Sequence, residues 1–112
     1  MVTAETAVVL PVLLLVLAAA VSALVVVGAQ LRCVDAAREA VRAATRGDPP
    51  ADVARVVTGA GPAGAIVGQV VSGGAVTVTV SADVRPLGPL PLHLRVSASA
   101  TGLLEPGVTA PP

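Results

Sequence analysis

The chain has 112 residues, of which 54% are hydrophobic and only 12% are charged, and it contains no Phe, Tyr or Trp. Every cationic side chain is an arginine, the net charge is zero and the arginines form no dense run, which excludes an electrostatic basis for nucleic-acid binding. The single cysteine excludes an internal disulfide framework and a multi-cysteine zinc site. This composition describes one domain at most, less polar than an ordinary soluble domain.

The N-terminal segment, residues 1–30, predicts a transmembrane helix. From Ala7 to Ala29 there are 23 residues without a charge, and fourteen of them are Leu or Val. A helix of that length rises about 35 Å and so spans a hydrocarbon layer of about 30 Å. Leu and Val each favour insertion near the centre of such a helix. We therefore expect a single membrane span.

Two other interpretations of this segment compete with a span. A buried core helix would need protein around its whole circumference, and a chain this short has little to spare. A cleaved secretory signal fits the small residues Gly28 and Ala29, although the segment has no basic start and is about twice as long as the usual apolar core of about 7 to 15 residues. The signal interpretation stays open at this point.

Residues 31–47 predict an amphipathic extension of the same helix. The apolar residues of this segment recur at helical spacing, with charged residues on the opposite face; the stripe consists of Leu31, Val34, Ala37, Val41 and Ala44. Gly47 suits the position just past a helix end. The helix is therefore expected to continue out of the membrane as far as this glycine.

Residues 48–102 predict a small α+β region. A short helix is expected with Asp48 as its N-cap and Pro49 as its first residue, ending at Gly59. Three strands follow, at residues 65–71, 75–84 and 92–101; the second and third alternate apolar and polar residues. The pattern is typical of an antiparallel meander with one apolar face.

The apolar face of this sheet requires a cover, and the amphipathic helix can supply one. The predicted fold class is therefore α+β: a long N-terminal transmembrane helix continues into an amphipathic helix that packs on a small three-stranded antiparallel sheet. The tail, residues 103–112, is rich in Pro and Gly and is predicted to be disordered.

Glu5 and Pro11 are the candidate interaction residues. Glu5 lies just before the apolar run, where its carboxylate either reaches water at the membrane surface or pairs with an α-amino group of a neighbouring chain. Pro11 removes a hydrogen bond to the carbonyl of Ala7, so we expect a kink or local loosening there. The alternative is that the helix tolerates the proline, as membrane helices often do.

Cys33 follows the apolar run closely. A small buried hydrophobic side chain is one interpretation of this cysteine, and a possible intermolecular contact through a disulfide is the other. No residue pattern predicts catalysis, a cofactor or a metal site. We expect the protein not to be an enzyme and to have no small-molecule substrate.

The stretch from Thr3 to Leu13, TAETAVVLPVL, resembles the N-terminal signature of TadE-like minor pilins, close to A-x-E-x-A-x-x-x-P. These are pseudopilins of the Flp or Tad type IV pilus system. Residues 31–40, LRCVDAAREA, are similar to the helix that follows the membrane in that family. The resemblance implies a pilin-like fold and, as partners, the membrane, other pilin subunits and a pilus assembly platform. It also implies roles in assembly for Glu5 and Pro11.

In the family, a peptidase cuts after a glycine that ends a short basic leader, and the glutamate is the fifth residue of the mature chain. Glu5 matches that position if Met1 is the first mature residue; the sequence as given shows no such leader. Four arginines follow the span, Arg32, Arg38, Arg42 and Arg46. The positive-inside rule would place them in the cytoplasm, whereas the resemblance implies an extracytoplasmic C-terminal region.

The resemblance and the residue patterns together predict a membrane-anchored minor pilin or pseudopilin that contributes to assembly of a Tad/Flp-type pilus or a related secretion system. Its expected place is the bacterial cytoplasmic membrane, as a single-pass protein with its C-terminal region outside, and then a cell-surface filament. The alternative prediction is a secreted or membrane-tethered module that binds cell-envelope material through its sheet.

Overall fold

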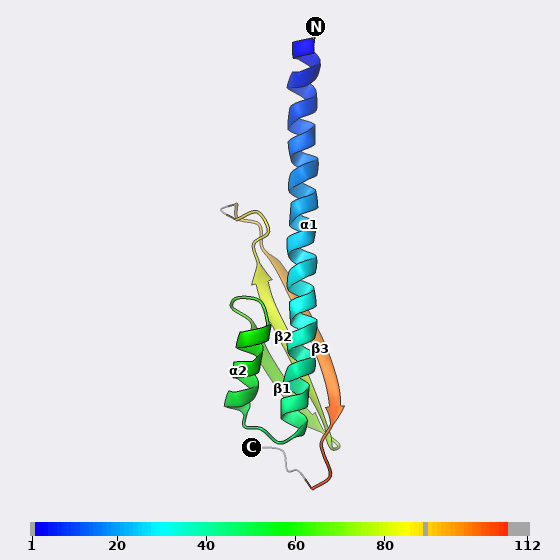
Figure 1. Ribbon diagram of the computed structural model, residues 1–112, viewed down its shortest axis with the longest axis vertical. Helices are drawn as coiled ribbons and strands as arrows, with labels where there is room; N and C mark the ends of the chain where they lie inside the picture. The colour runs from blue at the N-terminus through cyan, green and yellow to red at the C-terminus, as the bar shows by residue number, and fades with distance from the viewer. Residues whose placement is uncertain (1, 89, 108–112) are drawn as a thin grey trace.

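The computed structural model describes residues 2–88 and 90–107. Within these residues the chain forms two helices and three strands: α1 (Val2–Thr45), α2 (Pro50–Ala60), β1 (Ile66–Ser72), β2 (Ala75–Val84) and β3 (Leu94–Leu103). Figure 1 shows the N-terminal half of α1 projecting from a small domain that gathers around its C-terminal half. The molecule is accordingly elongated, at 77 × 20 × 18 Å. The predicted α+β fold with a long apolar helix is confirmed.

The end of α1 is fixed by a glycine. Gly47 has a φ of 85°, a left-handed conformation that residues with a Cβ rarely adopt. Its N–H donates to the carbonyl of Ala44 at 3.0 Å, and the next N–H, of Asp48, donates to the carbonyl of Ala43 at 3.2 Å. This pair of bonds is the Schellman arrangement, which satisfies carbonyls that the helix end leaves free. Gly47 therefore occupies the position that its sequence predicts.

The three strands form an antiparallel sheet in the order β1-β2-β3, as predicted. Gly73 and Gly74 join β1 to β2 with φ angles of 58° and 80°, and a two-residue hairpin turn with two positive φ angles matches the natural twist of paired strands. Along β2 every second side chain is buried; these inward residues are Val76, Val78, Val80, Ala82 and Val84. The outward residues carry hydroxyls and one carboxylate, which gives the sheet one apolar face.

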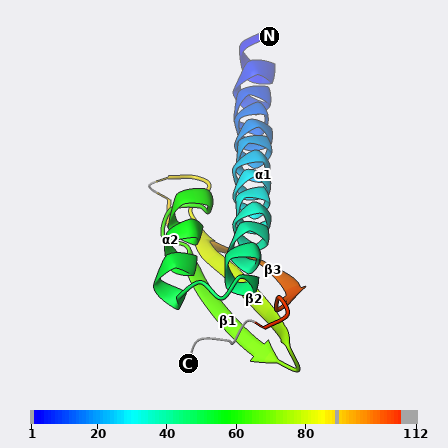
Figure 2. The ribbon, with the colours of Figure 1, turned by 60° about the horizontal axis from the view of Figure 1, so that its bottom comes forward.

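The C-terminal half of α1 covers that apolar face, as Figure 2 shows from below. Its contribution to the core consists mainly of alanines; the buried residues of α1 are Cys33, Ala36, Ala37, Ala40, Val41, Ala43 and Ala44. Small side chains let the helix approach the sheet closely. At Gly102 of β3 an added Cβ would lie only 2.9 Å from the Thr45 Cγ2 atom, so the backbone of β3 runs directly against α1.

The predicted stripe on this helix was too narrow, and at one end wrong. Leu31 is 59% exposed, and the buried surface instead includes Ala36, Ala40 and Ala43. The second helix explains the difference, because α2 packs against α1 and buries Val53 and Val57 in the same core. A helix covered from two sides buries more than one stripe, and Leu31 lies on the side of α1 that stays exposed, although Val26 and Ala29 before it pack against the core.

The second helix starts one residue later than predicted. Pro49, and not Asp48, is the N-cap of α2, and Pro50 is its first residue. The reason is local: Pro49 precedes a proline, which disfavours helical geometry at the preceding residue, and Pro49 has φ −59° and ψ 150°. The helix ends at Ala60, one residue beyond the predicted Gly59.

The third strand also differs from its predicted limits. It pairs with β2 from Leu94, opposite Val84, to Leu103, opposite Ala75, because β2 supplies no partner beyond these residues. Leu92 therefore lies outside the strand. After β3 the N–H of Leu104 donates to the carbonyl of Gly74 at 2.8 Å. The first residues of the segment predicted as a disordered tail are therefore hydrogen-bonded to the domain. Residues 108–112 of that predicted tail lie outside the described residues.

Candidate functional site: the exposed half of the long helix

The first half of α1 carries apolar side chains that the rest of the described chain does not cover. All leucines and valines from Val8 to Leu24 are between 45% and 73% exposed. Within the described residues, α1 is the helix that is long and apolar enough to cross a membrane; its best 18-residue window has a mean hydropathy of 2.9 and none of it is buried. The buried-core interpretation of this segment is therefore wrong, and the helix has the properties of a membrane anchor.

Glu5 lies in the first turn of α1, where it is exposed. A carboxylate at this position is favoured by the partial positive charge of the helix N-terminus. Among residues 2–88 and 90–107, no ion pair involves it. Glu5 is thus the one charged side chain of the first 31 residues, placed at the outer end of an apolar cylinder.

Pro11 lies inside α1, which continues without a break on both sides of it. Figure 1 shows no sharp bend in this part of the helix, so the structure follows the tolerance interpretation and not the predicted kink. One proline removes one hydrogen bond of the ladder, to the carbonyl of Ala7. Six residues separate Pro11 from Glu5, which places the two side chains about 120° apart around the helix axis. They do not form one patch.

Cys33 is fully buried in the core and makes no disulfide. Burial raises the pKa of its thiol above the ordinary 9.0, because desolvation disfavours the thiolate. An intermolecular disulfide would require α1 to separate from the elements that cover it. The position of Cys33 agrees with the interpretation of a small buried apolar side chain, and the intermolecular contact stays a prediction.

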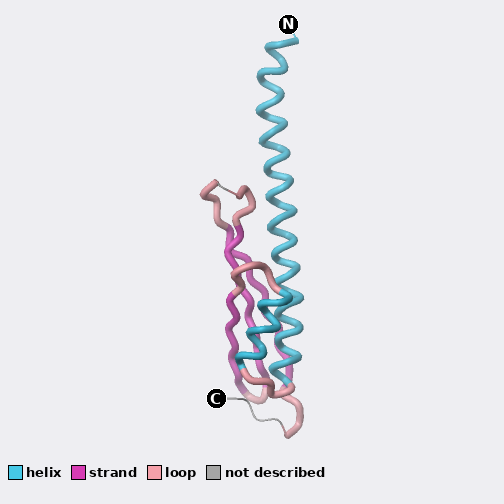
Figure 3. Tube along the Cα trace, turned by 60° about the vertical axis from the view of Figure 1, so that its left-hand side comes forward, coloured by secondary structure: helices cyan, strands magenta, loops and turns pink. Residues whose placement is uncertain are grey.

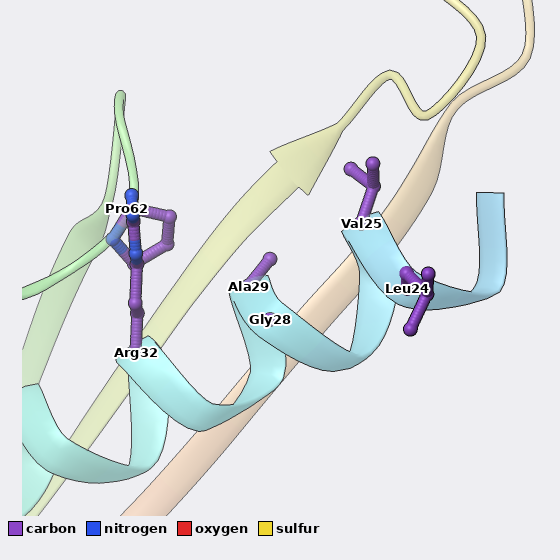
Figure 4. A pocket seen from close by; sticks show the side chains of 6 residues that line it. All are labelled: Leu24, Val25, Gly28, Ala29, Arg32 and Pro62. Carbon is purple, nitrogen blue, oxygen red and sulfur yellow. The ribbon is translucent and has the colours of Figure 1, made fainter. Parts of the chain in front are cut away.

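A shallow hollow lies where α1 leaves the domain, and Figure 4 shows its lining. Its volume is about 310 Å³, and it is lined by Leu24, Val25, Gly28, Ala29 and Arg32 of α1 together with Pro62. The hollow is open and mostly apolar, unlike the enclosed pockets that bind small ligands. Sequence reasoning missed it, because Pro62 is brought to α1 only by the packing of α2.

Gln30 fixes the point at which the domain joins the exposed helix, and its role was also missed. Its side-chain Nε2 donates to the backbone carbonyl of Ser97 at 2.8 Å, which ties α1 to β3. Gln30 is the first residue after the apolar run, and this position could have indicated that its side chain contacts the domain. Among the described residues, no group of three or more His, Cys, Asp or Glu side chains is placed to hold a metal ion.

A single long apolar helix that projects from a small α+β domain has the architecture of a membrane-anchored protein. Comparison with known proteins gives the family. The family model described as TadE-like protein matches residues 1–42, which include both stretches that carry the resemblance. A protein of Mycobacterium tuberculosis (strain ATCC 25618 / H37Rv) named apoptosis inhibitor Rv3655c is 39% identical over 108 residues, covering 95% of this chain and 81% of that protein. The chain belongs to the TadE-like family. No solved structure matches it.

Proposed function

We propose that this protein is a membrane-anchored minor pilin or pseudopilin that contributes to the assembly of a Tad/Flp-type pilus or a related secretion system. The observation that carries the proposal is the exposed apolar half of α1, with Glu5 in its first turn, in a chain of the TadE-like family. In this proposal the helix spans the bacterial cytoplasmic membrane once, and the α+β domain lies outside the cytoplasm.

The apolar half of α1 has two uses in the proposal. Before assembly, lipid covers its leucines and valines, because apolar surface of this size is unfavourable in water. After extraction into a filament, the helices of other subunits replace the lipid. The protein thereby acts through interaction, and no catalytic residue, cofactor or small-molecule substrate is assigned to it.

Glu5 determines which helices meet in the proposed assembly. A carboxylate placed among apolar helices is costly unless it is paired. Because the described residues offer Glu5 no ionic partner, the partner in the assembly is a positive group of another chain, and an α-amino group is the one that lies at the same end of a parallel neighbour. Pro11 leaves the Ala7 carbonyl without its helical donor, which eases local bending during extraction.

The test compares two glutamates of the same helix. Glu5→Ala is expected to abolish co-purification with pilus or assembly-platform components, while the protein still fractionates with membranes. The matched control is Glu39→Ala, which removes an exposed carboxylate from the domain half of α1 and should leave co-purification intact. Unchanged co-purification of the Glu5→Ala variant would show that Glu5 has no part in assembly.

A second candidate is a membrane-tethered module that contacts cell-envelope material through the outer face of its sheet. That face carries rows of exposed hydroxyls, with Thr77 bonded to Thr101 at 2.9 Å and Thr79 to Ser99 at 3.0 Å. Hydroxyls in fixed positions suit polar polymers such as glycans. The name of the mycobacterial relative refers to inhibition of apoptosis, and our proposal takes from that relative only the family.

The outer-face hypothesis is tested in the full chain, because α1 supplies much of the core and a fragment without it would lose the cover of the sheet. The Thr79→Val, Ser99→Ala variant removes one hydroxyl pair without entering the core. Reduced sedimentation with isolated cell-wall material, with co-purification of pilus components unchanged, would favour the envelope-binding function. Equal sedimentation of variant and parent would count against it.

A further inference from the structure

We propose that the connection between β2 and β3, residues 85–93, is a second membrane-contacting element that inserts shallowly into the bilayer surface beside α1. The inference rests on the membrane anchoring by α1 proposed above. It assigns a lipid partner to a loop whose described residues are exposed, apart from Pro86, which is buried, and Leu87, which is half-buried.

The composition of this loop is apolar where loops are ordinarily polar. Residues 85–93 read RPLGPLPLH, so leucine and proline fill most of the positions between Arg85 and His93. Leu90 and Leu92 are 55% and 43% exposed. Exposed leucines that lie close together in one loop are typical of a surface that contacts another apolar phase.

The loop lies on the membrane side of the domain. Two contacts place β3 along α1: Gly102 runs against Thr45, and the Ser97 carbonyl accepts from Gln30. Going back from Ser97 to Leu94 adds about 10 Å of strand, equivalent to six or seven residues of helix at 1.5 Å each. The start of β3 is therefore level with roughly residue 23 of α1, inside the uncharged run of residues 7–29.

The β2–β3 connection lies on the N-terminal side of the domain (Figure 1). Figures 1 and 3 show the β2–β3 connection extending beyond the strands toward the N-terminal end of α1. In Figure 4 the end of β2 lies near the turn of α1 that carries Val25. If the apolar part of α1 lies in the bilayer, the described residues of this loop meet the same bilayer.

The backbone of the loop is suited to an environment poor in water. Prolines occupy three of the seven positions from 86 to 92, and proline has no N–H to leave unsatisfied. Two further N–H groups are used within the loop, because Gly88 donates to the Arg85 carbonyl at 3.3 Å and Leu90 to the Leu87 carbonyl at 3.4 Å. The carbonyls still require water or headgroups, since exposed irregular backbone does not enter the hydrocarbon centre. The insertion is therefore interfacial.

The ends of the loop carry the polar groups that a bilayer surface favours. Arg85 and His93 are both exposed and lie at its two ends, where the connection leaves the sheet. An arginine at this level can direct its guanidinium to lipid phosphates while the leucines face the acyl chains. Leucines at the tip with cationic or polar groups at the base match the layering of a membrane interface.

Lipid is the favoured occupant of this surface because the loop continues the apolar surface of α1 on the same side of the domain. A second copy of the chain is the competing occupant, and the experiment separates the two. Since the chain contains no Trp, Tyr or Phe, a single introduced tryptophan reports its own surroundings without background.

The experiment uses the full chain in vesicles of phosphatidylcholine and phosphatidylglycerol, with and without brominated acyl chains. Three variants are compared: Leu90→Trp in the loop, Leu17→Trp in the apolar run, and Leu103→Trp, which replaces a 76% exposed leucine at the opposite end of the sheet. Leu92→Trp repeats the loop measurement at a second position. We expect blue-shifted emission and quenching by brominated lipid for the loop variants and for Leu17→Trp, and neither effect for Leu103→Trp.

Each other outcome is informative. Quenching of Leu17→Trp together with unquenched, red-shifted emission from both loop variants would overturn the loop inference and leave the anchor in place. Absence of quenching in Leu17→Trp would instead refute membrane anchoring itself. Blue-shifted loop emission that brominated lipid does not quench, and that weakens as the protein is diluted in lipid, would identify a second copy as the occupant and overturn the proposal.

Discussion

The two halves of α1 belong to one uninterrupted helix and yet have different surroundings. Between Val8 and Leu24 the leucines and valines are all exposed, whereas between Cys33 and Ala44 most small residues are fully buried. The first half is built from large aliphatic side chains, and the second from alanines. Large side chains offer area to a fluid phase such as lipid, whereas small ones allow a sheet to approach at close range.

The difference shows that apolar character alone does not identify a protein core. The most hydrophobic part of the molecule is the part that the domain leaves uncovered, and the core is the less hydrophobic, alanine-rich part. Substitutions that exchange the properties of the two halves should therefore have opposite effects on anchoring and on folding.

The largest effect is expected from charges in the first half. Fourteen Leu and Val residues of the run favour insertion by about 0.3 to 0.6 kcal/mol each, and an arginine near the helix centre costs about 3 kcal/mol. The double variant Leu14→Arg, Leu17→Arg should therefore cancel most of the driving force and release the protein from membranes under alkaline carbonate extraction. The control variant Val70→Arg, Leu103→Arg changes two exposed residues of the sheet and should stay in the membrane fraction. Release of this control from the membrane would show that the first half of α1 is not the specific anchor.

Enlarging an alanine should matter in only one half. Ala40→Leu places three extra carbon atoms at a fully buried position, and overpacking of this kind costs about 1 to 3 kcal/mol of stability. Ala19→Leu makes the same change in the exposed half and should leave the unfolding midpoint in detergent unchanged. Denaturant titration followed by circular dichroism measures both. Equal midpoints for the two variants would mean that the C-terminal half of α1 is not packed tightly against the sheet and α2.

The close contact between α1 and β3 should be sensitive to a single methyl group. Gly102→Ala would place its Cβ 2.9 Å from the Thr45 Cγ2 atom, and we expect a loss of about 1 kcal/mol, since the lower entropy of the unfolded alanine chain offsets part of the clash. Adding Thr45→Ser removes that methyl group but keeps the hydroxyl that donates to the Arg42 carbonyl. The double variant should recover stability; failure to recover would place the strain elsewhere.

The smallest effect concerns the Cys33 thiol. Burial raises its pKa, so the folded protein holds the proton more tightly than the unfolded chain. The stabilisation that the buried, protonated thiol gives is fully present below the unfolded pKa, the ordinary 9.0, and is lost as pH rises through the folded pKa. The chain has no Lys or Tyr, so few other groups titrate there. Unfolding midpoints at rising alkaline pH should fall slightly for the parent and stay level for Cys33→Ala. Parallel curves for the two proteins would show that the Cys33 thiol does not cause the loss of stability.

Periodicity and turn chemistry were enough to predict most elements. The uncharged run, the glycine at position 47 and the alternation along residues 75–84 each correspond to one local rule, and each prediction agrees with the structure. Local rules were less reliable where two constraints compete. Asp48 is an excellent N-cap by residue type, but the Pro49-Pro50 pair moves the helix start by one residue.

Pairing across the sheet and packing of α2 lay beyond local rules. The strand β3 begins at Leu94 because β2 ends opposite it at Val84, which no pattern within residues 92–101 could reveal. Leu31 appeared to belong to the buried stripe, but it lies on the side of α1 that neither the sheet nor α2 covers. Glu5 and Pro11 were chosen as candidate residues from their places near and in the apolar run, and their roles in assembly stay predictions. The burial of Cys33 required the whole core.

The order of the amino acids was sufficient to define a long apolar helix, a small sheet with one apolar face and the family signature around Glu5, because these depend on composition, periodicity and short-range spacing. Only the tertiary structure decided which half of the helix is the core, that Gln30 joins it to β3, and that the leucines of residues 85–93 lie on the same side as the anchor. Such relations depend on strand order and helix packing, which bring together residues that are far apart in the chain.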